Sequence, residues 1–231
     1  MRNFLLVCLM AATAIKSHAQ TGELEAHWEI AIPVSYSVSE RWKMNTTVTS
    51  RTGFYRQVQE ADNVEWFVNF LEATQYATYR ASHKISLTAG YRYRSVNPTE
   101  AAGEREHRLI QQLGIVHLRA PTRIASRLQI EQRFRTDDFA HRIRYRVSGD
   151  RPLQGEKLDV GEFYGIVSNE LVTQFGKEVN TTMENRISVG FGNKWGQTSK
   201  IQLEGQIRSF DVLDNPRNTF FLMTGFYFNL D

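Results

Sequence analysis

Residues 26–38 read Ala-His-Trp-Glu-Ile-Ala-Ile-Pro-Val-Ser-Tyr-Ser-Val, with an apolar side chain at nearly every second position. In an extended chain Trp28, Ile30 and Ile32 fall on one face, and His27 and Glu29 fall on the other. This alternation is typical of a β-strand whose two faces meet different surroundings. The stretch exceeds the roughly five or six residues of most soluble strands. A tilted strand of this length, at about 3.3 Å per residue, is long enough to cross a bilayer.

The same alternation recurs along the chain, with turn-like residues between the segments. It is clear in residues 123–135, where isoleucine, leucine and phenylalanine alternate with arginine, glutamine and glutamate. It is weaker in residues 105–119 and 163–173, and residues 64–79 also fit a helix. About eleven segments can be counted. Bacterial single-chain barrels have even strand numbers, so we expect 10–12 strands and favour 12.

The connections between the segments differ in length. Short turns are predicted near Ser39, Ser82, Pro121 and residues 194–196. Longer polar loops are predicted at residues 56–63, 95–104, 175–181 and 211–218. Short turns on one rim and long loops on the other are typical of an outer-membrane barrel. The long connection at residues 150–161 departs from this scheme.

Residues 1–19 have the pattern of a cleaved signal peptide. A basic start at Arg2 precedes an apolar run over residues 4–15, and Ser17-His18-Ala19 resembles a cleavage site. We expect residues 20–231 to form one outer-membrane β-barrel domain. Cys8 is the single cysteine and lies in the predicted signal peptide, so disulfides and thiolate metal sites are not expected in the barrel.

Composition and charge exclude several other classes of protein. The mean hydropathy is −0.43, and the sequence has no apolar run long enough for a polytopic helical membrane protein. Removing Arg2 and Lys16 from the 28 basic residues leaves 26, against 25 acidic ones. The basic residues alternate with apolar ones instead of clustering around stacking aromatics, so nucleic-acid binding is not expected.

The apolar faces could pack between two sheets of a soluble sandwich or could face lipid. Long polar faces rich in arginine favour lipid, as do aromatic residues near strand ends that could form interfacial girdles. The aromatic residues are Trp28, Tyr36, Trp42, Phe54, Trp66, Tyr93, Phe134 and Phe228.

If the apolar faces meet lipid, a set of arginines and glutamates points into the lumen. One interpretation is a small solute channel whose basic wall favours anions. The other is a network that fills a narrow lumen and prevents conduction. The predicted lumen-lining residues are Arg127, Glu131, Arg133, Arg142, Arg144, Arg146, Glu184, Arg186, Glu204 and Arg208.

A catalytic interpretation has less support. The chain has no His-Glu-x-x-His or Gly-x-Ser-x-Gly motif and no metal-ligand spacing, so we predict no catalytic residue, metal or cofactor. A barrel enzyme that modifies lipid or envelope polymer would assemble its site from separate strands. His107 with Glu106, and Ser168 with Glu170, are the groupings that such an enzyme could use.

Several short motifs follow one another in a specific order: Glu106-His107-Arg108, Gln111-Gln112, Glu131-Gln132-Arg133-Phe134, residues 141–146, Asn169-Glu170 and Glu184-Asn185-Arg186. In order and spacing they resemble the domain of unknown function 2490 family. The resemblance extends over essentially all of residues 20–231. It implies a Gram-negative envelope location and a barrel fold, and it carries over no activity and no site residue.

Together these observations predict an all-β protein, a single antiparallel transmembrane β-barrel of the bacterial outer membrane. Its expected partners are outer-membrane lipid and the barrel-assembly machinery. Channel, closed structural or interaction barrel, and barrel enzyme remain the three functional alternatives.

Overall fold

The computed structural model describes residues 25–58, 61–63, 66–100, 103–118, 120–136, 138–177, 179–212, 214 and 217–231. The predicted signal peptide, with Cys8, lies outside the described residues. The described part is all β, and none of it forms a helix long and apolar enough to cross a membrane. The strands are β1 (Glu25–Ser37), β2 (Trp42–Val58), β3 (Ala61–Asn63), β4 (Phe67–Arg80), β5 (Ile85–Val96), β6 (Glu104–Leu118), β7 (Arg123–Arg135), β8 (Phe139–Pro152), β9 (Phe163–Gly176), β10 (Thr182–Asn193), β11 (Ser199–Phe210) and β12 (Arg217–Asn229).

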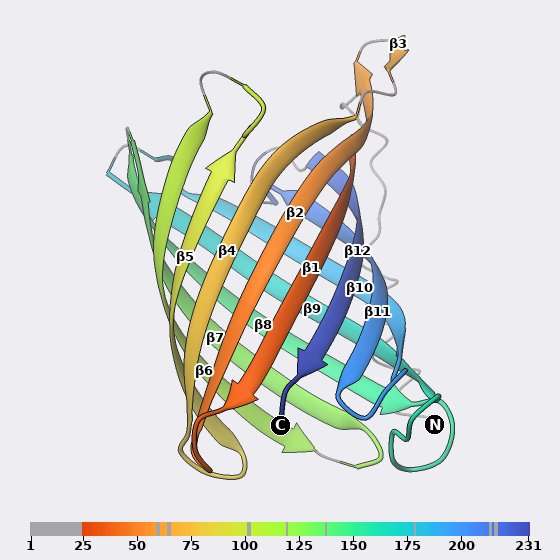
Figure 1. Ribbon diagram of the computed structural model, residues 1–231. Helices are drawn as coiled ribbons and strands as arrows, with labels where there is room; N and C mark the ends of the chain where they lie inside the picture. The colour runs from red at the N-terminus through yellow and green to blue at the C-terminus, as the bar shows by residue number, and fades with distance from the viewer. Residues whose placement is uncertain are drawn as a thin grey trace.

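The strands close into a barrel in which sequence neighbours pair antiparallel (Figure 1). β3 pairs with β2 alone and extends that strand's hairpin, so the described wall has eleven strands. The preference for 12 strands is therefore wrong, and the count of about eleven segments is right. An odd wall closes because β1 pairs with β12 in parallel, for example Trp28 beside Leu222, and with β2 in antiparallel. Parallel pairing also satisfies the backbone groups, so closure does not require an even number.

The segments with weak alternation are strands. Residues 67–80 form β4, which pairs with β2 and β5 over most of its length, so the helical alternative for residues 64–79 is wrong where the structure describes them. Residues 105–119 and 163–173 coincide largely with β6 and β9, as expected.

The two rims of the barrel have different connections. We call the rim where β1, β4, β6, β8, β10 and β12 end the turn rim, and the opposite one the loop rim. The turn rim has short connections at residues 38–41, 81–84, 119–122 and 194–198, and a long one at 153–162. The loop rim carries the β2–β3 extension and connections 97–103, 177–181 and 211–216 (Figure 1). Its β7–β8 connection, residues 136–138, is shorter than the alternating scheme predicts.

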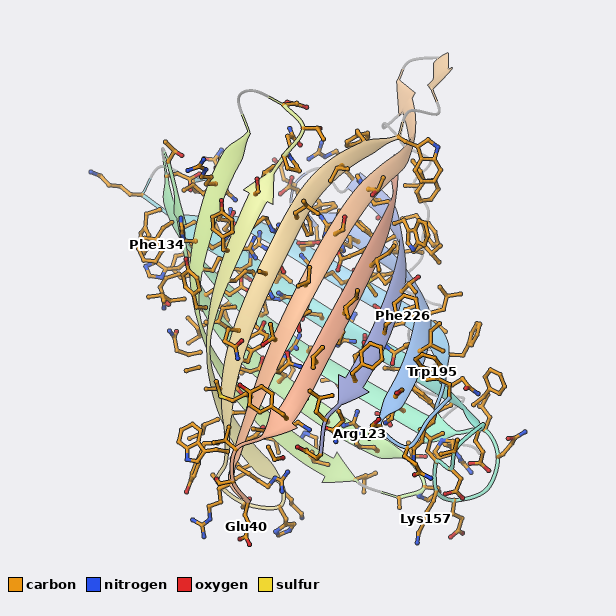
Figure 2. The ribbon with its side chains drawn as sticks, in the orientation of Figure 1. Glu40, Arg123, Phe134, Lys157, Trp195 and Phe226 are labelled. Atoms are coloured by element: carbon orange, nitrogen blue, oxygen red, sulfur yellow. The ribbon has the colours of Figure 1, made fainter. Side chains whose placement is uncertain are left out.

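The wall separates a charged interior from an apolar outside, which inverts the usual arrangement of a folded domain. Alternation along each strand produces this separation: on β7, Glu131 is fully buried, whereas its neighbour Ile130 is 38% exposed on the outside. Figure 2 shows aromatic and aliphatic side chains projecting from the outer surface, with Phe134 and Trp195 near opposite rims.

Two glycines of the inner face allow tyrosine rings to lie flat against the wall. A Cβ at Gly192 would lie 2.3 Å from Cζ of Tyr164, and one at Gly90 would lie 2.4 Å from Cδ1 of Tyr76. Both tyrosines are partners of these glycines across neighbouring strands. The rings fill interior space that an alanine at either glycine would deny them.

Candidate functional site

Glu131 of β7 is at the centre of the buried ion-pair network. Its Oε1 accepts hydrogen bonds from Nη1 of Arg144 at 3.0 Å and from Nε2 of Gln129 at 2.5 Å. Its Oε2 accepts one from Nη1 of Arg108 at 3.3 Å. Glu131 is 0% exposed and Arg108 is 1% exposed, so these charges meet each other and not solvent. Buried charges require such partners because a lone ion in a dry interior costs several kcal/mol.

Arg144 of β8 joins this glutamate to a second one. Its Nη2 donates to Oε2 of Glu170 on β9 at 2.7 Å. Glu170 also accepts hydrogen bonds from Nη2 of Arg127 at 3.0 Å and from Nη1 of Arg186 at 3.5 Å. Strands β7 to β10 are thereby tied together across their inner faces.

Glu106 of β6 is the third carboxylate of this wall and lies nearer the loop rim. It accepts hydrogen bonds from Arg108, from Nη2 of Arg133 at 2.6 Å and from Nε of Arg135 at 2.8 Å. Arg133 also donates to the amide oxygen of Gln174 on β9. Glu106, Glu131 and Glu170 thus each hold two or three guanidinium groups, an arrangement that matches the fork of arginine donors.

The opposite wall buries its arginines against aromatic rings. Cζ of Arg208 lies 3.6 Å from the ring centroid of Phe221, and Cζ of Arg94 lies 3.8 Å from that of Phe70. Arg51 lies between the two rings, 4.5 Å from Phe70 and 4.8 Å from Phe221. Both phenylalanines are 2% exposed, so these cation–π contacts are dehydrated.

Two further glutamates compensate the charge of this second wall. Glu72 of β4 pairs with Nη2 of Arg94 at 2.5 Å and with Nε of Arg92 at 3.1 Å. Glu29 of β1 pairs with Nη2 of Arg51 at 2.7 Å and, at 3.6 Å, with Nη2 of Arg208. The network therefore continues around the inner circumference.

The ten residues selected from the sequence all have polar partners in this interior. Beyond the contacts above, Arg142 donates to Gln174 at 2.8 Å, Arg186 makes two hydrogen bonds of 2.8 Å to Glu184, and Arg146 lies 3.9 Å from Glu204. The side chains of Arg127 and Arg146 are partly accessible, at 32% and 27% exposure.

Sequence reasoning missed several members of the network. Glu29 and Glu72 were overlooked because each is a single acidic residue in a largely apolar segment. Arg108 appears in the sequence analysis only within a family motif, and Glu106 and Glu170 appear there in motifs and in the catalytic groupings, not among the lumen-lining residues. All of them could be identified from their positions, because each falls on the polar face of its strand. In the structure each lies beside other charged inner residues, as Arg108 lies beside Arg133.

The inner wall leaves little accessible surface at mid-height. Glu131, Arg108, Gln129 and Ser188, which come from three different strands, are each at most 1% exposed. The wall of a water-filled passage must be accessible to water. These four side chains are instead covered by other protein groups.

The catalytic groupings considered from the sequence do not form sites. His107 and Glu106 are consecutive on β6, and Glu106 is buried while His107 is exposed on the outside, where Nδ1 lies 2.6 Å from the Tyr91 hydroxyl. Ser168 and Glu170 share the inner face, but three arginines occupy the Glu170 carboxylate. Over the described ranges, no group of three His, Cys, Asp or Glu side chains could hold a metal ion.

Comparison with known proteins finds one family. No curated protein and no solved structure matches the chain. A family model described as a protein of unknown function, DUF2490, matches residues 29–219, which run from β1 into β12 and include all the carboxylates of the network. The chain belongs to the DUF2490 family.

Proposed function

We propose that this protein is an outer-membrane β-barrel closed by its own Arg–Glu network, and that it works through its rims and outer surface. The observation that carries the proposal is the burial of Glu131 and Arg108 at mid-height, at 0% and 1% exposure. The closed structural or interaction barrel is thereby favoured over the solute channel, because a permeant ion would have to displace paired charges.

The outer surface supports the membrane location. Aromatic side chains pair near both rims: Trp42 with Tyr79 at 5.2 Å and Trp195 with Phe228 at 6.2 Å near the turn rim, and Phe134 with Phe139 at 5.0 Å near the loop rim. The surface between is rich in exposed aliphatic residues. Two aromatic girdles that flank an apolar band are typical of transmembrane barrels. Such a protein would be exported through its predicted signal peptide and would need the barrel-assembly machinery for insertion.

The proposal is tested by the conductance of the folded barrel in a planar bilayer. The full chain would be expressed in a Gram-negative bacterium, extracted from the outer-membrane fraction, and checked for the gel shift between unboiled and boiled samples. We expect a folded barrel that gives no discrete current steps. Steps from the unmodified protein would overturn the closed interior, and absence from the outer-membrane fraction would overturn the location.

A variant with smaller interior side chains tests whether the Arg–Glu network closes the barrel. Replacing Arg108, Glu131 and Arg144 together by serine removes large side chains while leaving small polar groups. This triple variant should conduct if it retains the gel shift. The matched control replaces Arg123 and Asp150, an ion pair at the turn rim with an Nη2–Oδ1 distance of 2.7 Å, by serine, and it should stay silent. A hollowed variant that folds and stays silent would place the closure elsewhere in the lumen.

A further inference from the structure

A pair of glutamine amides lies on the outer surface of the barrel, among apolar side chains. Gln111 of β6 and Gln132 of β7 exchange two hydrogen bonds of 3.1 Å, because each amide nitrogen donates to the carbonyl oxygen of the other. Gln111 faces outward, since it is directly opposite Ile130, which is exposed on the outside. It is also the central residue of β6 (Glu104–Leu118), with seven residues on either side. In the proposed membrane setting this amide pair lies near the middle of the bilayer.

The reciprocal bonds leave half of the hydrogen-bonding capacity of each amide unused. A glutamine amide has two N–H donors and two acceptor positions on its carbonyl oxygen, and each member of the pair uses one of each kind. Within the described part of the chain, no other group forms a hydrogen bond with either amide. Lipid tails offer neither donors nor acceptors, so these positions would stay unsatisfied on a wall that faces lipid. The free positions therefore indicate a protein surface that covers the pair.

An apolar groove on the outer surface begins beside Gln111 and extends toward β4 and β2. Its volume is about 540 Å³. Ala77 and Ala89 line it and are directly opposite each other on β4 and β5, and Ala89 is in turn opposite Gln111. Trp42 and Tyr79 line its end at the turn rim. Small side chains in this position allow a second membrane-embedded wall to approach closely.

The other side of Gln111 carries large side chains in place of alanines. Ile143 and Tyr145 project outward from β8, at 39% and 48% exposure. A twofold axis that runs along the membrane normal past Gln111 keeps every residue at its own depth and exchanges the two sides. The groove of one copy then faces β8 of the other copy. Each glutamine pair meets its own counterpart, and its free donors and acceptors are self-complementary under this symmetry.

We propose that the outer face of β4–β8 is the interface of a homodimer, in which the Gln111–Gln132 pairs of two copies bond to each other across a twofold axis. The amides favour a protein over a lipid. Their equal numbers of free donors and acceptors, at one depth, favour a second copy of this chain. The groove and the large side chains of β8 supply the complementary shape. This inference rests on the proposed membrane location and names the partner of the outer surface.

Cross-linking of single-cysteine variants in isolated outer membranes tests which face meets the second copy. Cys8 is the single cysteine and lies in the predicted signal peptide, so the unsubstituted chain serves as the blank. Ala89→Cys should give a product of twice the chain mass with a short bis-maleimide. The matched control is Val189→Cys, which is 61% exposed on β10 and should stay monomeric. A product of any other mass would overturn a second copy as the partner. Equal dimer yields at the two positions, or no dimer at either, would overturn the interface.

Leucine substitutions test whether the amides drive the association. Gln111→Leu with Gln132→Leu removes the donors and acceptors but suits a wall that faces lipid, so the variant should keep the gel shift. The dissociation constant of the dimer in liposomes should rise roughly tenfold, which is typical of polar contacts between membrane segments. Energy transfer between labelled copies, followed as lipid dilutes the protein, measures this constant.

The matched control for the leucine variant removes a different amide contact of the outer surface. Asn169→Leu with Asn185→Leu removes a 2.6 Å hydrogen bond between β9 and β10. This control should leave the dissociation constant unchanged. An equal rise in both double variants, or no rise in the glutamine variant, would overturn the role of the glutamines.

The outcomes distinguish this inference from the proposed function. A monomer that comes from the outer-membrane fraction and stays silent in the planar bilayer would overturn the dimer and leave the closed barrel in place. A dimer that conducts would overturn the closed interior alone. Absence from the outer-membrane fraction would overturn both proposals, because water would then satisfy the amides.

Discussion

The two sides of the barrel interior bury arginine by different means. Along β6 to β9, carboxylates such as Glu131 and Glu170 each hold several guanidinium groups at hydrogen-bonding distance. Along β11, β12, β1, β2, β4 and β5, the carboxylates Glu29 and Glu72 are supplemented by the rings of Phe70 and Phe221, which cover the flat faces of Arg51, Arg94 and Arg208. Ion pairs therefore dominate the first side, and cation–π stacking is found on the second.

The difference shows which property of arginine each side uses. A carboxylate engages the edge of the guanidinium through directed N–H donors and fixes its position. An aromatic ring engages the face through the ring quadrupole and excludes water without offering a hydrogen bond. Removing a carboxylate therefore strands buried positive charge, while removing a ring removes packing and a weaker attraction. The comparison predicts that substitutions on the two sides lower the free energy of unfolding by unequal amounts.

The largest effect is expected for Glu131→Gln. The amide keeps the shape of the side chain but leaves Arg108 and Arg144 without their shared negative charge, and breaking a buried ion pair from one side costs about 3–5 kcal/mol. Urea unfolding of the detergent-refolded barrel, followed by tryptophan fluorescence and by loss of the gel shift, would measure this decrease. A loss below about 1 kcal/mol would show that this side tolerates unpaired charge and would remove the contrast.

A smaller effect is expected for Phe221→Leu on the other side. Leucine retains most of the apolar volume but loses the stacking on Arg51 and Arg208, so the free energy of unfolding should fall by about 1–2 kcal/mol. Phe220→Leu is the matched control, because Phe220 precedes it on β12 and is 44% exposed on the outside. If both variants lost the same stability in urea unfolding, the cation–π contacts would have no special weight.

The smallest effect is expected for Asp150→Asn at the turn rim. Its partner Arg123 has a side chain that is 54% exposed, and such pairs contribute about 0–1 kcal/mol. The same unfolding measurement, repeated at low and high salt, should show any difference from the unmodified protein vanishing as salt rises. A salt-insensitive loss comparable to that of Glu131→Gln would mean that burial does not set the strength of these ion pairs.

Apolar residues that face the interior weaken the alternation of apolar and polar residues in the sequence. Phe70, Ile110 and Val172 face inward and are each at most 2% exposed, and each directly adjoins an outward leucine: Leu71, Leu109 or Leu171. Two consecutive apolar residues interrupt a period of two. This interruption is why residues 64–79, 105–119 and 163–173 alternate poorly, although all three regions form long strands.

Alternation predicted the strands and the inward arginines, but the partners depend on closure. Arg127 of β7 reaches Glu170 of β9 across the intervening β8. This contact requires the curvature of the wall, which no local pattern encodes. Whether the number of strands is odd or even likewise depends on whether β1 and β12 pair in parallel or antiparallel. An even number of strands is a regularity among known barrels and not a requirement of hydrogen bonding. The preference for 12 strands is wrong because it depends on that regularity.

Because β1 and β12 pair in parallel, the chain enters the barrel at one rim and leaves it at the other. A barrel with an even number of strands returns its chain to the side from which it started. Here β1 starts at the loop rim and β12 finishes at the turn rim, after eleven crossings of the wall (Figure 1). A domain joined ahead of β1 and another joined behind β12 would therefore stand on opposite sides of the bilayer proposed above. The odd wall thus places the two ends of the barrel at opposite rims, so in the proposed membrane setting they would face different compartments.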